Sequence, residues 1–277
     1  KEASFFIPAQ RVLTLRNGWP RPFTDYDSGD PYVVRHFSEM IRHLMEAGLG
    51  SGESAIFPQP GRLKKDLRNA LSNGIFSGSE LRLDTHGLQK RIILQVEKNA
   101  LPFMVWSAGQ REFIPLLLGL YWLLPPSKVS KHKDINWVIV EEPEAGLHPQ
   151  AVSAVLLGVM ELLDRGYKVI LSTHSSHILD FVWGWKMLQS CSGDPNLLLE
   201  MLDAPKTQAL NELAKRIKSS TPRVYYFERH DQSIHTRDIS NLDLGAEDIQ
   251  EWGWGGLPEF SGRVNDVVSR LIQEQEA

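Results

Sequence analysis

Two apolar segments of strand length, joined by an apolar helix, constrain the fold of this chain more than any other feature of its sequence. The segments are Trp137–Val140 and Val169–Ser172, and the helix between them runs from Pro149 to about Leu163. Continuous apolar runs of this length are typical of strands that are buried on both faces of a parallel sheet. We therefore predict a βαβ unit and an α/β fold class.

Acidic residues follow the first of these strands, and a histidine follows the second. Glu141, Glu142 and Glu144 come directly after the first strand, and His174 lies just beyond the second. Ligands of parallel sheets bind beyond the carboxyl ends of the strands. Hydrolysis of a Mg²⁺-bound phosphate needs a carboxylate for the ion, a carboxylate that orients water and a polar group near the terminal phosphate. The two strand ends together predict a site of this kind.

A third segment, upstream of these strands, begins a long apolar helix. Ser107 and Gln110 have the spacing of a capping box, in which the serine hydroxyl accepts from a first-turn amide and the glutamine reaches back. The same helix start has free N–H groups and the small residues Ala108 and Gly109, which let an anion approach closely. The two interpretations are compatible.

In their order along the chain, these segments resemble the C-terminal half of an ABC-type ATPase head. The resemblance is to the structural-maintenance-of-chromosomes, RecF and overcoming-lysogenization-defect proteins. Ser107–Gln110 matches their signature motif, and Val138–Glu142 matches their Walker B strand. Glu144–Pro149 matches the D-loop, and His174 matches the switch histidine. The D-loop sequence Glu-Ala-Gly-Leu-His-Pro resembles the DNA-repair and phage-defence branch rather than the transporters.

The resemblance implies an ATPase that uses ATP and Mg²⁺, with two heads that enclose the nucleotide. Glu142 would orient the attacking water, Glu141 would hold Mg²⁺, and His174 would sense the terminal phosphate. Ser107 and the amide of Gly109 would contact that phosphate from the opposite head. The residues implied to bind nucleotide are Ser107, Ala108, Gly109, Gln110, Glu144, Gly146 and His148.

The resemblance also implies a P-loop NTPase fold, similar to an ABC-ATPase head, with a parallel core sheet, a β-rich lobe and an inserted helical segment. We expect residues 1–105 to form part of an N-terminal lobe, and residues 106–277 to form the ATPase core with a C-terminal extension. A Walker A motif is absent from this sequence, because the glycine-rich segment 48–54 lacks the required lysine. We expect the Walker A and Q-loop segments to precede Lys1.

Local patterns predict further elements around the motifs. Pro8 interrupts or ends a predicted inner strand whose partners lie elsewhere in the chain. Amphipathic spacing predicts two helices, and alternating segments separated by a turn predict a β-hairpin. The predicted elements are the strand segments Phe5–Ile7, Val12–Leu15, Leu81–Asp84, Arg91–Val96, Pro102–Val105, Val224–Phe227 and Ser233–Arg237, and the helices Pro31–Ala47, Leu63–Leu71 and Ser261–Ile272.

Composition limits the cellular compartment and the partners that we expect for the protein. The 277 residues carry a net charge of −4 and a single cysteine, Cys191, which excludes a disulfide scaffold and favours a reducing, cytoplasmic location. No apolar segment reaches the roughly 18 residues of a membrane span, so we expect no membrane partner. The mildly acidic balance gives no general attraction to nucleic acid.

Three functions remain open. The preferred hypothesis is an ATPase head that forms a homodimer or higher homo-oligomer around ATP and controls an effector subunit, a nuclease or toxin, in phage defence. The alternatives are a DNA-repair head of the RecF type and a nucleotide-gated scaffold with little turnover. DNA is a possible partner: the basic residues Arg62, Lys64, Lys65 and Arg68 predict either a solvated helix face or a DNA contact.

The C-terminal segment carries its own expectation. Asp243–Gly256 is acidic and rich in glycine, and it contains Trp252 and Trp254. An acidic flank repels DNA, and aromatic side chains in polar surroundings are typical anchors of protein interfaces. We therefore expect the C-terminal region to contact protein, either a second copy or an effector, and not nucleic acid. This region includes the acidic segment, Trp183–Trp185 and the strand pair near Val224–Arg237.

Overall fold

The computed structural model describes residues 3–49, 55–59, 61–85, 90–125, 131–241, 263–265 and 267–268. The chain divides into two compact units. The first comprises residues 1–173 and 195–218, and the second comprises residues 174–194 and 219–277. The expected lobe boundary between residues 105 and 106 lies inside the first unit.

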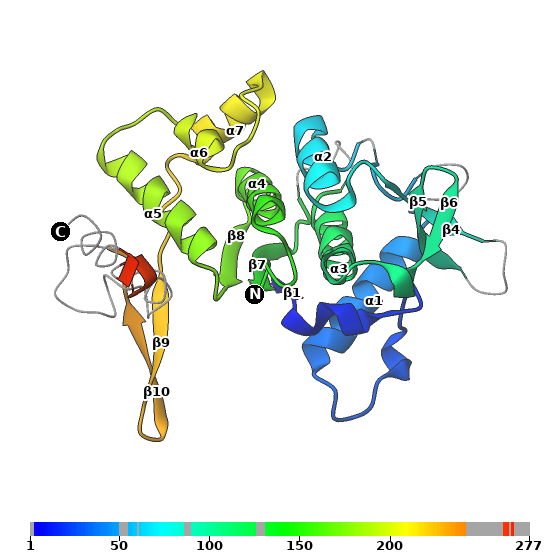
Figure 1. Ribbon diagram of the computed structural model, residues 1–277. Helices are drawn as coiled ribbons and strands as arrows, with labels where there is room; N and C mark the ends of the chain where they lie inside the picture. Colours follow the sequence, from blue (N-terminus) through cyan, green and yellow to red (C-terminus); the bar gives the residue numbers. More distant parts are fainter. Residues whose placement is uncertain are drawn as a thin grey trace. The chain divides into compact units, whose positions relative to one another are not determined.

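A parallel three-stranded sheet forms the centre of the first unit. Its strands are β1 (Ala3–Ile7), β7 (Ile135–Glu141) and β8 (Lys168–Ser172), in the order β1-β7-β8. Helix α4 (Pro149–Asp164) connects β7 to β8 (Figure 1). The predicted βαβ unit and the α/β fold class are therefore confirmed.

Apolar side chains on the strands and on two helices build the core of this unit. Val138 and Val140 of β7 are buried, and so is Ile7 of β1. Helices α1 (Tyr32–Glu46) and α3 (Ala108–Leu123) pack against each other, and α1 contacts β1. The rings of Phe5 and Phe37 meet edge to face at 5.9 Å. Helix α4 is buried on nearly every side, which explains why most of its residues are apolar.

The β-rich part of the first unit contains the predicted hairpin. Strands β4 (Glu80–Asp84) and β5 (Arg91–Val96) pair in antiparallel fashion, and β6 (Asn99–Pro102) extends the sheet. The other elements of the first unit are β2 (Leu15–Arg16), β3 (Trp19–Pro20), α2 (Lys65–Leu71), α6 (Leu197–Met201), α7 (Gln208–Ile217), the 3-10 helices η1 (Ala9–Thr14), η2 (Phe23–Asp25) and η4 (Phe103–Val105), and the π-helical turn η3 (Ser72–Phe76).

Three predictions of local structure were wrong. Val12–Leu15 does not continue the first strand, because residues 9–14 form the 3-10 helix η1, in which the Thr14 hydroxyl donates to the Arg11 carbonyl. β1 pairs only with β7 in the described part of the chain, so it lies at the edge of the sheet there and not inside. The strand expected at Pro102–Val105 ends at Pro102, after which Phe103–Val105 turns as η4.

The second unit contains α5 (Ser176–Ser190) and the antiparallel pair β9 (Tyr225–His230) and β10 (Ser233–Asp238). Leu179 of α5 packs with Trp183 and Val224, and Trp185 is buried. The tryptophans of this helix therefore belong to a small core. Asp243–Gly256, with Trp252 and Trp254, lies outside the described residues, as does most of the predicted helix 261–272.

No helix in the described part of the chain is both long enough and apolar enough to span a membrane.

Candidate functional site

The first part of the site is the acidic turn, residues 141–147, at the carboxyl end of β7. Glu141 ends the strand, and the Glu142 amide donates to the Ser172 carbonyl at the end of β8, at 2.9 Å. Glu142 has a φ of 44°, in the left-handed region. This conformation costs a non-glycine residue about 1–2 kcal/mol. The Ala145 amide closes the turn by donating to the Glu142 carbonyl at 3.0 Å.

Two carboxylates of the acidic turn accept hydrogen bonds from residues that follow the neighbouring strands. The Ala9 amide donates to Oε2 of Glu141 at 3.0 Å. The Thr173 hydroxyl donates to Oε1 of Glu144 at 2.5 Å, which joins the residue after β8 to the turn after β7. The acids predicted at one strand end are thus held by residues that follow both neighbouring strands.

A buried arginine, whose role the sequence did not reveal, lies behind the acidic turn. Arg11 has no solvent exposure. Its guanidinium donates to three backbone carbonyls: from Nε to Glu112 at 3.1 Å, from Nη1 to Glu141 at 2.8 Å and from Nη2 to Glu142 at 2.9 Å. Burial lowers the pKa of Arg11, and the nearby carboxylates of Glu112, Glu144 and Glu142 act in the opposite direction.

The second part of the site is the start of α3. The Ser107 hydroxyl accepts from the Gln110 amide at 3.2 Å, and the Gln110 side-chain oxygen accepts from the Ser107 amide at 3.1 Å. The predicted capping box is confirmed. Ser107 and Ala108 are exposed, so the positive end of this 16-residue helix is accessible to an anion from outside the chain.

The acidic turn and the start of α3 are in direct contact. A β-carbon at Gly109 would lie 2.6 Å from the carbonyl oxygen of Gly146. Gly146 has a φ of +70°, and a β-carbon there would lie 3.3 Å from Cγ of Glu112. The fold thus joins the segments that resemble a signature motif and a D-loop, and glycine at both positions permits the close approach.

The two histidines of the predicted site belong to different compact units. His148 is exposed and caps α4, since its Nδ1 accepts from the Gln150 amide at 3.4 Å, and Pro149 occupies the first turn of that helix. His174 follows Thr173 and is the first residue of the second compact unit.

The residues of the acidic turn fit a magnesium ion that arrives with a nucleotide. Mg²⁺ in nucleotide sites takes one or two carboxylates, with phosphate oxygens and water as its other ligands. Glu141 and Glu142 supply suitable oxygens at the end of β7. In the described part of the chain, no group of three or more His, Cys, Asp or Glu residues is arranged to hold a metal alone. The donor set therefore fits shared coordination and not a closed protein cage.

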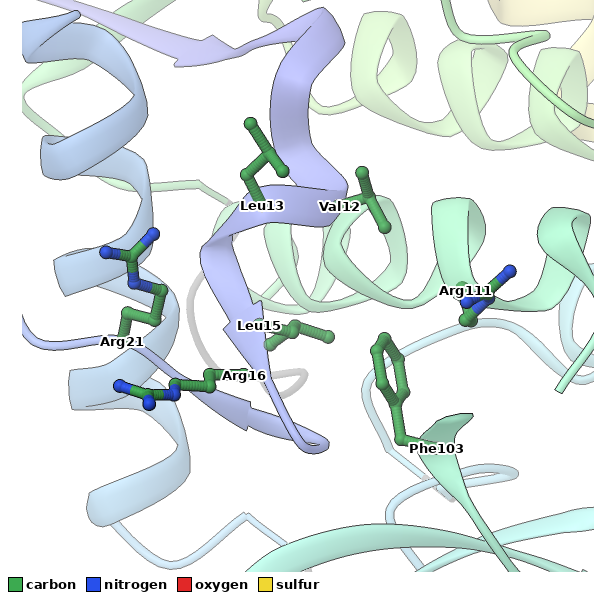
Figure 2. Close-up of a pocket in the computed structure, with 7 residues that line it drawn as sticks. All are labelled: Val12, Leu13, Leu15, Arg16, Arg21, Phe103 and Arg111. Carbon is green, nitrogen blue, oxygen red and sulfur yellow. The ribbon is translucent and has the colours of Figure 1, made fainter. Parts of the chain in front are cut away.

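A separate hollow of about 430 Å³ lies near the start of α3, and Figure 2 shows its lining. In that view the side chains of Arg16 and Arg21 lie on one side of Leu15, and Arg111 lies on the other. The three arginine side chains do not point to a common position, so they do not form a cluster that would bind one phosphate group. It is lined by Val12, Leu13, Leu15, Arg16, Arg21, Phe103 and Arg111.

The basic residues near α2 serve contacts within the chain. Arg62 donates to the Tyr121 carbonyl at 2.8 Å, and Arg68 donates to the Leu63 carbonyl at 3.3 Å. Lys64 forms an ion pair with buried Glu161 at 2.6 Å. Lys65 is exposed. Three of these four residues therefore have partners within the chain.

The parallel sheet, the acidic turn at its carboxyl end and the exposed start of α3 define the class as an α/β fold of the P-loop NTPase-like AAA type. Comparison with known families agrees. Residues 34–180, just over half of the chain, match the family described as "AAA domain, putative AbiEii toxin, Type IV TA system". The chain belongs to this AAA domain family.

One similar curated protein is the Old nuclease of Escherichia phage P2. It is 29% identical to this chain over 142 residues, which are 51% of the chain and 22% of the nuclease. The chain thus spans less than a quarter of that relative's length. The match agrees with the expected likeness to the overcoming-lysogenization-defect proteins. No solved structure matches the chain.

Proposed function

We propose that this chain is the catalytic half of an ATPase head, and that two copies enclose ATP and Mg²⁺ between them. One observation carries the proposal: the exposed start of α3 is packed, through Gly109 and Gly146, against the turn that bears Glu141 and Glu142. A rigid pair of this kind can present an anion site to a partner and carboxylates to its own nucleotide.

Each part of this pair has a task in the proposed reaction. Bound Mg²⁺ would neutralise charge on the phosphates. Glu142 orients the water that attacks the terminal phosphate, and Glu141 contributes an oxygen to the ion. Ser107 and the amide of Gly109 contact the terminal phosphate of the other copy's ATP. We assign His174 to the terminal phosphate of the chain's own ATP, as a polar contact.

The test is Glu142→Gln in the full-length protein. The amide is nearly isosteric but cannot accept a proton from water, so we expect ATP binding to persist and steady-state hydrolysis to fall by about 100-fold or more. Glu212→Gln is the matched control, because Glu212 is an exposed carboxylate of α7 that pairs only locally with Lys215. Undiminished hydrolysis in Glu142→Gln would remove this residue from the mechanism and refute the proposed site.

We further propose that the ATPase controls an effector in phage defence. The support is that the matched family is described as a putative toxin and that the phage relative is a nuclease. Loss of protection from phage in Glu142→Gln, with the protein still present at wild-type level in the cell, is the expected result. Full protection by that variant would separate defence from hydrolysis, as the scaffold alternative requires.

A further inference from the structure

We propose that Arg11 is a positioning residue for hydrolysis, which sets the backbone of Glu142 and links it to the helix that carries Ser107. The inference rests on the proposed function, because it assigns Arg11 a role in the same ATP site. In the proposed site Arg11 does not bind ATP or Mg²⁺ itself. It acts through the carbonyls of Glu112, Glu141 and Glu142.

The geometry of these three hydrogen bonds is the first argument. One planar guanidinium joins α3 to the end of β7. Glu112 belongs to the first turns of α3, Glu141 ends β7 and Glu142 follows it. All three donor–acceptor distances lie between 2.8 and 3.1 Å. A fork of fixed N–H directions restricts the relative position of its acceptors more than a single flexible donor does.

The backbone of Glu142 is the second argument. A glutamate in the left-handed region persists only where its surroundings hold it. Here the peptide groups on both sides are engaged: the Glu142 amide donates to Ser172, and its carbonyl accepts from both Ala145 and Arg11. The hydrogen bond from Arg11 thereby stabilises the turn that positions the Glu142 side chain.

The burial of Arg11 is the third argument. A fully buried guanidinium loses its hydration, so a protein retains one only where its hydrogen bonds compensate for that loss. Among the described residues Arg11 forms no salt bridge, and its three hydrogen-bond acceptors are backbone carbonyls. The charged guanidinium therefore holds the backbone of the acidic turn in place. A fixed backbone is what precise placement of the Glu142 carboxylate requires.

The test compares Arg11→Lys with wild type in the full-length protein. Lysine keeps the charge but lacks the planar fork, so it cannot hold all three carbonyls in the same arrangement. We expect kcat to fall by about 10-fold, because small misplacements of catalytic groups have effects of this order. KM for ATP should change by less than about 2-fold, because the affected residues orient water more than they bind nucleotide.

The matched control is Arg62→Lys. Arg62 is partly buried and, like Arg11, donates to a backbone carbonyl, but its acceptor is Tyr121 of α3 and not a residue of the acidic turn. Its replacement should lower the unfolding temperature and leave kcat unchanged. If lysine at position 11 prevents folding, Arg11→Gln is the second variant, because a neutral side chain avoids the desolvation of a charge.

A double-mutant cycle separates positioning from general support of the fold. If Arg11 acts through Glu142, Arg11→Lys should lower the single-turnover rate by less than about 2-fold in the Glu142→Gln background, against about 10-fold in wild type. Equal factors in the two backgrounds would overturn the inference, as would an unchanged kcat in Arg11→Lys. A slow Glu142→Gln beside a normal Arg11→Lys defeats only this inference, whereas a fully active Glu142→Gln defeats the proposed function as well.

Discussion

Gly109 at the start of α3 packs directly against the carbonyl of Gly146 in the acidic turn, so closely that no β-carbon fits between them. The separation from a β-carbon at Gly109 to that oxygen would be 2.6 Å. Real contacts of this type are longer, so a side chain at Gly109 must push one element away from the other. The contact therefore fixes the position of the start of α3 relative to the acidic turn.

The first prediction follows from this contact. Gly109→Ala should destabilise the fold by about 1–3 kcal/mol, because overpacking against backbone cannot be relieved by rotation of a side chain. The measurement is urea denaturation of the purified protein. The control is Gly158→Ala in the middle of α4, where the nearest atom would be Cδ1 of Leu120 at 3.5 Å.

The control should behave in the opposite way. An alanine within a helix is favoured over glycine by up to about 1 kcal/mol, so Gly158→Ala should be neutral or stabilising. Equal stability of the two variants would contradict the close packing of Gly109 on Gly146.

The second prediction separates capping from nucleotide contact at Ser107. Aspartate caps a helix as well as serine does and suits the positive helix end, so Ser107→Asp should keep or slightly raise the unfolding temperature. If Ser107 also faces the partner's terminal phosphate, the new carboxylate repels it and ATP-dependent dimerisation should fail. Light scattering with ATP and Mg²⁺, in the Glu142→Gln background, measures this association. Dimerisation at the wild-type level would leave Ser107 with its capping role alone.

The third prediction concerns Glu112, whose pKa is raised mainly because burial disfavours its ionised form. A raised pKa in the folded state adds stability below the ordinary value of 4.5, and that stability is lost as the pH rises through the folded pKa. Glu112→Gln removes the ionisable carboxyl group, so the variant does not lose this stability as the pH rises. The variant should be more stable than wild type near pH 7, and its advantage should disappear by about pH 4.

Thermal unfolding of both proteins from pH 4 to pH 7 checks this prediction. The charges of Arg11 and Arg111 oppose the effect of burial on Glu112 and limit its size. A variant that is less stable than wild type at pH 7 would show that the attraction to Arg11 outweighs the burial of the carboxylate.

Periodicity and local motifs predicted most of the fold. The apolar runs identified β7, α4 and β8, the alternating pattern identified β4 and β5, and the Ser107–Gln110 spacing identified the capping box. These features depend on neighbours in sequence. The 3-10 helix η1 was missed because it carries Arg11, whose partners lie 101 to 131 residues further along the chain.

The sequence indicated which residues belong to the candidate site, but not how those residues pack together. The sequence indicated that Glu141, Glu142 and Ser107 belong to motifs, since each motif is a short local pattern. It did not indicate that Gly109 meets Gly146, or that a buried arginine joins α3 to the acidic turn. Such contacts depend on how the elements pack, which no local spacing reports.

Complementation between two inactive chains tests the central claim, that each ATP site is shared by two copies, most directly. Ser107→Ala removes the hydroxyl that serves the partner's site without adding charge, and Glu142→Gln removes the water-orienting group of the chain's own site. A mixed pair then combines both defects in one site and leaves the other site intact. Since random pairing makes half of all dimers mixed, the mixture should regain about a quarter of the wild-type turnover per chain. Turnover equal to the average of the two separate variants would contradict a shared site and place Ser107 and Glu142 on the same nucleotide of one chain.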